Sequence, residues 1–315
     1  MRQLMRWGAA AGLVLGAGLT AGWGLALAMA PRVALAQPAT ATPGPLVAQR
    51  ATATPGPLVA QRATATPGPL VVVGGGGTTD EIVARALAIA GGPEAVVAVL
   101  PQASALATAG DSSVEMWRKA GAREAVKVTF DDRAVARAML GRATLIWMPG
   151  GDQNRFMQAV AGTGLDDLIR ERHRAGAVVG GTSAGAAVLS ASMITGDADL
   201  QSLTTGTTVL APGLGLWPGV IVDQHFLKRQ RSNRLISAVL DHPALVGVGI
   251  DESTAVIVQG TTLEVVGRSA VIVVDARRAT RADAIAGQPV AATGVTMAVL
   301  RAGMTFDLGV MEARR

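Results

Sequence analysis

One serine in this chain lies in a sequence context that suits covalent chemistry. Residues Gly181–Gly185 read G-T-S-A-G, after an apolar run and before apolar residues at helical spacing. The pattern G-x-S-x-G is typical of a nucleophile elbow, a tight turn that presents a serine between a strand and a helix. Glycines flank such a serine because larger side chains would collide in the turn. A glycine turn with an incidental serine at Ser183 would match this short pattern equally well.

A serine nucleophile needs a general base, and the chain contains only three histidines. His173 lies between arginines in a charged segment, which indicates a surface position. His242 lies in an Asp-His-Pro sequence, which is typical of a turn. His225 directly follows an apolar run that predicts a strand, so elimination favours it as the base.

Carboxylates that could orient this histidine follow the next apolar run. Asp251 and Glu252 end the predicted strand, and a buried carboxylate is costly without a partner, so we expect at least one of them to be paired. We favour Glu252 as the orienting acid. Asp197 and Asp199 are rivals, because they lie between the serine and the histidine as the acid does in α/β-hydrolases.

The chemistry that follows from such a set is acyl transfer to water. A histidine-activated serine attacks a carbonyl carbon, and the negative charge that forms on the oxygen requires N–H donors. The N–H of Ala184, at the start of the helix after the serine, is one expected donor. The Gly150-Gly151 turn supplies the other, which we place at Gly151.

Apolar runs alternate with helical segments over most of the chain, and this alternation predicts the scaffold. It indicates the α/β class: a mostly parallel sheet with helices on both faces, extended by C-terminal β-strands. The long helical segments include Leu165–Arg174 and a basic helix over Phe226–Leu240, and Thr296–Arg301 is a candidate last strand. The predicted strands before Ser183 are Leu70–Val73, Ala95–Leu100, Ala125–Phe130, Thr144–Met148 and Val178–Val179.

Four glycines, Gly74 to Gly77, follow the first predicted strand, and Thr78 or Thr79 would cap the next helix. A nucleotide-binding loop is disfavoured, because position 79 is threonine where G-x-G-x-x-G requires glycine and no Gly-Lys-Ser/Thr follows. We expect the loop to line the crevice at the carboxyl ends of the strands.

The chain before this domain predicts export. Residues 1–36 combine Arg2 and Arg6, a long uncharged stretch and an Ala-Leu-Ala site, which indicates a signal peptide or an uncleaved membrane anchor. Residues 37–69 carry a twelve-residue repeat, ATATPGPLVAQR, whose Pro, Thr and Gly content favours an extended linker over a recognition tract. The catalytic domain is then 70–315, and the enzyme is expected outside the cell or on the outer face of the cytoplasmic membrane.

Composition excludes several kinds of chemistry. The chain has no cysteine, so it has no disulfide and no thiol nucleophile. Five arginines and no acidic residue precede Leu70, so the rest of the chain balances its 23 acidic residues with as many basic ones, despite the net charge of +5. This balance gives no support to nucleic-acid binding. We expect neither a metal nor a cofactor.

Five ordered motifs resemble the cyanophycinases, within the dipeptidase E group of serine peptidases. The resemblance spans about Leu70 to Val274 and implies a glutamine-amidotransferase-like, flavodoxin-like α/β sandwich. It also implies an exopeptidase that releases β-Asp-Arg dipeptides from cyanophycin, a polyaspartate whose side chains each carry an arginine. The motifs are Gly150–Gln153, Gly180–Ala186, Asp223–Phe226, Arg229 with Asn233–Leu235, and Gly249–Glu252 with Thr254-Ala255.

By this resemblance Ser183 is the nucleophile, His225 the base and Glu252 the orienting acid. Arginines would suit the free carboxylates of the polymer, and an acid such as Asp223 would meet its guanidinium groups. Lys228 and Arg231 are expected on a solvated helix face. The implied substrate-binding set is Gln153, Asp223, Gln224, Arg229 and Arg234.

Two other functions stay open at this point. One is a related dipeptidase that acts on short Asp-X peptides, and the other is a noncatalytic binding protein with the same fold. Homodimer formation and anchoring by the N-terminal segment stay open as well, and export suggests use of polymer released into the surroundings.

Overall fold

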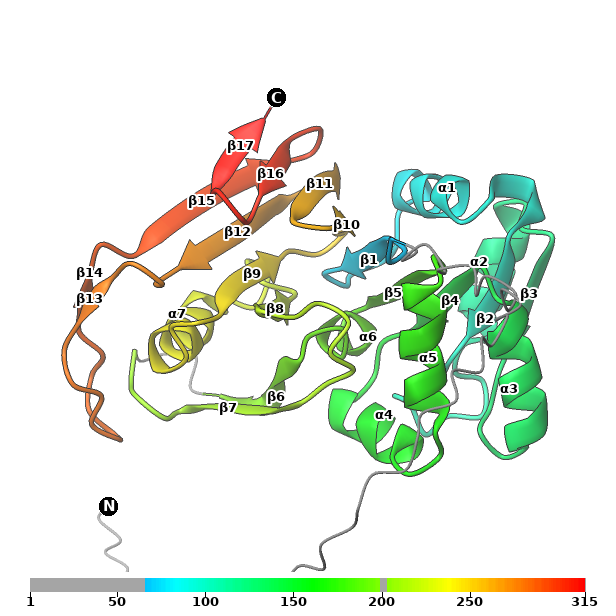
Figure 1. The fold of residues 1–315 in the computed structure, drawn as a ribbon, viewed down its shortest axis with the longest axis horizontal. Helices are drawn as coiled ribbons and strands as arrows, with labels where there is room; N and C mark the ends of the chain where they lie inside the picture. The colour runs from blue at the N-terminus through cyan, green and yellow to red at the C-terminus, as the bar shows by residue number, and fades with distance from the viewer. Residues whose placement is uncertain (1–65, 199–202, 315) are drawn as a thin grey trace, which may run out of the picture. The chain divides into compact units, whose positions relative to one another are not determined.

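The computed structural model describes residues 66–198 and 203–314 (Figure 1). The predicted signal or anchor, and the repeat linker up to residue 65, lie outside the described residues. In the part that is described, no helix combines the length and the apolar character needed to cross a membrane.

Within these ranges the larger sheet has nine strands, and its parallel half carries the serine. The order β1-β5-β4-β2-β3 is parallel throughout, and β10, β11, β16 and β17 extend it in antiparallel fashion beyond β1. The bounds of its strands are β1 Leu70–Val73, β2 Val96–Val99, β3 Glu124–Lys127, β4 Leu145–Met148, β5 Val178–Thr182, β10 Thr254–Gln259, β11 Thr262–Gly267, β16 Thr305–Asp307 and β17 Glu312–Arg314.

A second sheet carries the histidine and contains β8 (Val220–Gln224), β9 (Val246–Ile250), β12 (Ala270–Asp275) and β15 (Thr296–Arg301). The strand β8 before His225 therefore belongs to a different sheet from β5, the strand before Ser183. The strands β8 and β9 are parallel to each other, β9 pairs with β12, and neither pairs with a strand of the larger sheet. Two small hairpins, β6 with β7 and β13 with β14, complete the strands of the described ranges; their bounds are Ser192–Ala198, Thr208–Pro212, Thr280–Arg281 and Ala292–Thr293.

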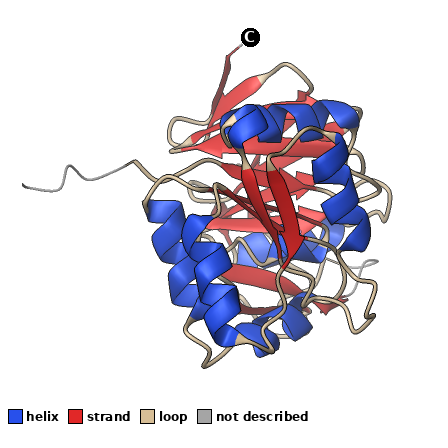
Figure 2. Ribbon diagram, turned by 90° about the vertical axis from the view of Figure 1, so that its right-hand side faces the viewer, coloured by secondary structure: helices blue, strands red, loops and turns tan. Residues whose placement is uncertain are grey.

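Alternating strand residues face two different cores, which explains the continuous apolar runs. In β1, Val71 and Val73 pack with α1 and α2, whereas Leu70 and Val72 join the core beneath α3 to α6. Helices therefore cover both faces of the parallel strands (Figure 2). The helices are α1 Asp80–Ile89, α2 Asp111–Lys119, α3 Arg133–Arg142, α4 Gln153–Val160, α5 Leu165–Arg174, α6 Ala184–Ala187 and α7 Ser232–Asp241.

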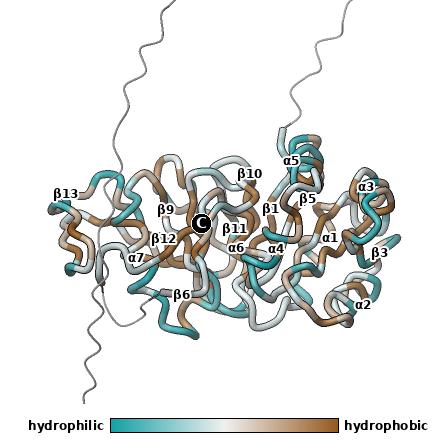
Figure 3. The backbone as a smooth tube through the Cα atoms, turned by 90° about the horizontal axis from the view of Figure 1, so that it is seen from below, coloured by the Kyte–Doolittle hydropathy of each residue, from teal (hydrophilic) through white to brown (hydrophobic). Residues whose placement is uncertain are grey.

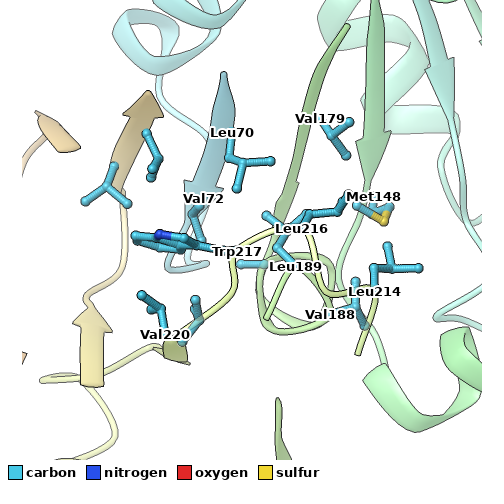
Figure 4. Close-up of a cluster of buried hydrophobic side chains, with 14 of the residues drawn as sticks. Leu70, Val72, Met148, Val179, Val188, Leu189, Leu214, Leu216, Trp217 and Val220 are labelled. Atoms are coloured by element: carbon cyan, nitrogen blue, oxygen red, sulfur yellow. The ribbon is translucent and has the colours of Figure 1, made fainter. Parts of the chain in front are cut away.

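One hydrophobic core joins the two sheets. Leu70 and Val179 of the larger sheet, Val220 of the smaller sheet and Trp217 between them belong to the same buried cluster (Figure 4). The hydropathy of the chain follows this plan, with hydrophobic strands inside and hydrophilic stretches on outer helices such as α3 and α5 (Figure 3). The packing of this core fixes the two sheets against each other.

Several predicted elements differ from the structure in their ends. The helix predicted over Phe226–Leu240 begins only at Ser232, because His225 and Gln230 have positive φ angles that a helix cannot contain. The strand Thr296–Arg301 exists as β15, but β16 and β17 follow it. Thr79 is the residue that caps α1, through the N–H of Ile82.

Candidate active site

Ser183 lies at a sharp turn between β5 and α6. Its φ of 56° and ψ of −117° place it outside the regions that residues with a side chain usually adopt, which is typical of a strained nucleophile elbow. A side chain at Gly181 would collide with the carbonyl of Gly185, and one at Gly185 with the carbonyl of Met148. The turn is therefore crowded on both sides, as the sequence pattern predicts.

Ser183, His225 and Glu252 form a continuous hydrogen-bonded chain. The serine Oγ lies 2.9 Å from Nε2 of His225, and Nδ1 of the same ring lies 2.6 Å from Oε1 of Glu252. In the neutral tautomer that fits this chain, Nδ1–H donates to the carboxylate and Nε2 accepts from the serine hydroxyl. The rival Asp199 lies outside the described residues, and the side chain of Asp197 is not described.

The chain path explains how two sheets assemble one site. His225 follows β8, and Asp251 to Ser253 connect β9 of the smaller sheet to β10 of the larger sheet. The strand β10 pairs with β1, with Ala255 opposite Val73, so this short connection passes the carboxyl end of β1. Glu252 thereby reaches the same place as the elbow.

The surroundings of His225 favour its neutral form. Burial lowers the pKa of His225 below its usual 6.5, and the nearby charges of Arg229 and Arg231 lower it further, while the hydrogen bond to Glu252 and its charge oppose the shift. A neutral imidazole can accept the serine proton at pH 7. The direction of this shift suits a general base.

The glycine loop after β1 packs against His225 and Glu252. A Cβ at Gly75 would overlap the imidazole ring of His225, and a Cβ at Gly76 would overlap the side chain of Glu252. The carbonyl of Gly74 also accepts the N–H of His225 at 2.6 Å. The loop lines the crevice, as expected. It contacts His225 and Glu252, two of the three residues joined by the hydrogen bonds described above.

The expected oxyanion donors lie beside the serine. Gly150 follows β4, and a Cβ there would come within 3.3 Å of the Cβ of Ser183. Among the described residues, the N–H groups of Gly151 and Ala184 have no backbone acceptor. Unpaired N–H groups are what an oxyanion hole requires, so the two groups stay candidates for that role.

The turn after His225 is held by a buried carboxylate. Oδ1 of Asp251 accepts the N–H groups of Leu227 and Lys228 at 3.1 and 2.9 Å, and Oδ2 accepts the hydroxyl of Ser269 at 2.7 Å. Burial alone would raise the pKa of Asp251, but these hydrogen bonds lower it overall. Both carboxylates after β9 are therefore paired, and the sequence did not reveal the role of Asp251 as an anchor.

Arg229 is the exposed cation of the predicted substrate-binding set. It lies on the turn anchored by Asp251, and its charge is close enough to lower the pKa of His225. In the part of the chain that the structure describes, its side chain has no hydrogen bond or ion pair. It is therefore available to a negatively charged ligand.

Asp223 and Arg234 do not face solvent, which corrects the expectation that Asp223 meets a substrate guanidinium. Asp223 is fully buried, and Nε of Arg234 donates to its Oδ2 at 2.8 Å, with a second bond from Nη2 to Oδ1. The carboxylate is thus satisfied from within the protein. The two residues form a buried bidentate ion pair.

Arg231 was expected on a solvated face and is instead 9% exposed. Its Nη1 donates to the backbone carbonyl and the side-chain oxygen of Gln224 at 2.6 and 2.8 Å and lies 3.5 Å from Asp223. Burial lowers its pKa to about 10, so it stays charged at pH 7. We predicted an exposed Arg231 because we took Arg229, Arg231 and Arg234 to lie on one helix. That helix begins only at Ser232, so the prediction was wrong. Lys228 is exposed, as expected.

Both predicted glutamines have structural partners. Gln153 is buried at the start of α4, and its Nε2 donates to the carbonyl of Ile194 at 2.9 Å. Gln224 is buried next to His225 and binds Arg231. Gln153 thereby holds β6 against the start of α4, and Gln224 holds the buried Arg231.

The two remaining histidines lie away from the chain of hydrogen bonds. His173 was expected on the surface but is buried at the end of α5, because its face of that helix packs inward with Leu165 and Ile169. His242 caps the end of α7. Within the described ranges, no group of three or more His, Cys, Asp or Glu residues is placed to hold a metal ion.

Comparison with known proteins decides the family. The sequence pattern that defines peptidase family S51 matches residues 70–266, which is more than half of the chain. The chain belongs to peptidase family S51. It is therefore a serine-type peptidase, as the resemblance predicted, and the matched region contains Ser183, His225 and Glu252.

Curated relatives in this family carry the name cyanophycinase. The protein of Geminocystis herdmanii is 40% identical over 203 residues, which are 62% of this chain and 75% of that protein. The protein of Thermosynechococcus vestitus is 40% identical over 215 residues, 64% of this chain and 67% of its own. That of Trichormus variabilis is 35% identical over 230 residues, 70% of this chain and 77% of its own.

A solved peptidase from an acI-B1 Actinobacterium has the same fold as this S51 member. Its TM-score is 0.54 at 21% identity, and the match covers 78% of this chain and 98% of that one. The likeness confirms the predicted α/β class with its mostly parallel central sheet.

Proposed function

We propose that this S51 peptidase is an exported cyanophycinase. It hydrolyses cyanophycin to β-Asp-Arg dipeptides through Ser183, His225 and Glu252. The observation that carries the proposal is the set of hydrogen bonds that joins Ser183 to His225 and His225 to Glu252. It is found in a protein that is 40% identical to a protein named cyanophycinase.

The residues divide the reaction among them. His225 takes the proton of Ser183 as the hydroxyl attacks the carbonyl carbon, and Glu252 stabilises the imidazolium that forms. The N–H groups of Gly151 and Ala184 bind the negative oxygen of the tetrahedral intermediate. His225 then protonates the leaving amine, and water releases the acyl group by the reverse sequence.

Substrate recognition rests on charge. Each side group of the polymer ends in the carboxylate and the guanidinium of an arginine. Arg229 is exposed close to His225 and binds a carboxylate of the polymer in this proposal. Asp223, Arg231 and Arg234 are buried and pair with one another, so their role is structural. Gln153 and Gln224 are buried and bind Ile194 and Arg231, so they hold neighbouring protein groups in place.

The proposed place of action is outside the cell, because the N-terminal sequence resembles an export signal followed by a repeated linker. Free polymer in the surroundings would then be the substrate. Fractionation of cells that express the full chain tests this point, with the activity expected in the medium or on the outer face of the membrane.

The decisive experiment is incubation with cyanophycin followed by mass analysis of the products. We expect β-Asp-Arg from the wild type and none from Ser183→Ala, whose fold is checked by circular dichroism. Equal dipeptide release by both would contradict the mechanism. Cleavage of short Asp-X peptides without cyanophycin cleavage would instead favour the related dipeptidase.

A further inference from the structure

A groove lies next to the Gly150-Gly151 turn, and the proposed reaction does not use it. It has a volume of about 680 Å³, within the range of about 300–1,000 Å³ of ligand sites. Three parts of the chain line it: the loop after β2, the segment after β3, and α4. All three follow carboxyl ends of parallel strands, which is where α/β proteins bind ligands.

The groove is connected to the active site through Ala103. The carbonyl of Ala103 accepts the N–H of Asp152 at 2.8 Å, and a side chain at Gly151 would collide with Ala103. The next residue, Ser104, lines the groove. Since Gly150 lies beside Ser183, the residues Gly151 and Ala103 are the contacts that join the nucleophile to the groove.

The charges of the groove suit a ligand with both signs. Arg155 and Asp131 are exposed and line it together, and neither side chain has an ion pair or a hydrogen bond with the described residues. Lys127 also lines the groove but is occupied by Asp111 and by the carbonyl of Ala107. One cation and one anion are thus left for a ligand.

We propose that this groove binds a further Asp-Arg unit of the same polymer chain. Arg155 pairs with the carboxylate of its arginyl group and Asp131 with its guanidinium. Leu106, which is 71% exposed at the groove, contacts the aliphatic part of that side group. The inference rests on the proposed function, because only a polymeric substrate reaches both places.

The test measures KM for fragments of two, three and four Asp-Arg units. In the wild type, KM should fall at the length that first reaches the groove. Arg155→Ala and Asp131→Asn should each remove about three- to fivefold of that gain, the size expected for an exposed ion pair. Arg155→Lys should restore part of it.

Arg133→Ala is the matched control. Arg133 is an exposed cation close to Asp131 in sequence, but it does not line the groove, so its loss should leave the length dependence unchanged. A wild-type KM that is independent of length, or a gain that survives both groove substitutions, would overturn the inference. Failure of the wild type to cleave cyanophycin at all would reject the proposed function instead.

Discussion

The imidazole ring of His225 lies against Gly75 so closely that a methyl group on Gly75 would occupy the position of the ring. Gly75 also has a φ of 98°, which disfavours any residue with a side chain. The base is therefore held by the glycine loop on one side and by Glu252 on the other.

Gly75→Ala should displace the ring and break the contact with Ser183. We expect kcat to fall about 100-fold, because misplacement by about 1 Å costs that much in an oriented site. Gly77→Ala is the matched control, since a Cβ at Gly77 meets no atom within 4 Å although its φ is also positive. Equal losses in the two variants would show that backbone strain, rather than the ring contact, is responsible.

The acid limb of kcat/KM should have its midpoint below pH 6.5. The proposed mechanism needs neutral His225, whose pKa is lowered by burial and by Arg229. The folded protein accordingly binds fewer protons than the unfolded chain near this pH, so the contribution of His225 to stability is lost as pH falls through the folded pKa. Arg229→Ala removes a positive charge and should move the limb towards higher pH; a shift to lower pH would contradict this electrostatic account.

Asp223→Ala should destabilise the protein by about 3–5 kcal/mol, because it leaves the buried cation Arg234 without its partner. Urea unfolding followed by circular dichroism measures the change. Asp167→Ala is the control, since its ion pair with Arg170 is exposed and should contribute less than about 1 kcal/mol. Comparable values for the two substitutions would mean that Asp223 is not the anchor of the buried cations.

Asp251→Ala should slow the labelling of Ser183 by a serine-directed phosphonate about 10-fold, because two hydrogen bonds to the turn after His225 and one from Ser269 are lost. Asp251→Asn keeps an acceptor oxygen and should retain most of the rate. Asp275→Ala removes an equally buried carboxylate at the end of β12, where it binds Arg277. If Asp275→Ala slowed labelling as much, the effect would reflect general loss of stability.

Local patterns predicted the scaffold well. The bounds of α5 and the alternation of β1 to β5 with helices follow from apolar spacing, which the sequence displays directly. The split into two sheets could not be predicted, because β8 and β9 have the same apolar pattern as strands of the larger sheet. Only the pairing of β8 with β9 and of β9 with β12, which are long-range contacts, separates them from the larger sheet.

The candidate site was predictable where residue types restrict the choice. Three histidines and one elbow leave few combinations, and the structure brings Ser183, His225 and Glu252 together. The arginines were harder, because a turn with two positive φ angles replaces the expected helix. Burial of Arg231, and of Asp223 against Arg234, depends on that turn.

The division of the site between two sheets makes catalysis a property of the assembled domain. Ser183 comes from the larger sheet, whereas His225 is delivered by the smaller one, and a shared apolar core joins them. A chain in which the two sheets have not packed would contain Ser183, His225 and Glu252, but the hydrogen bonds that join them would be absent. Peptidase activity should therefore report the packing of the two sheets against each other, and not the formation of either sheet alone.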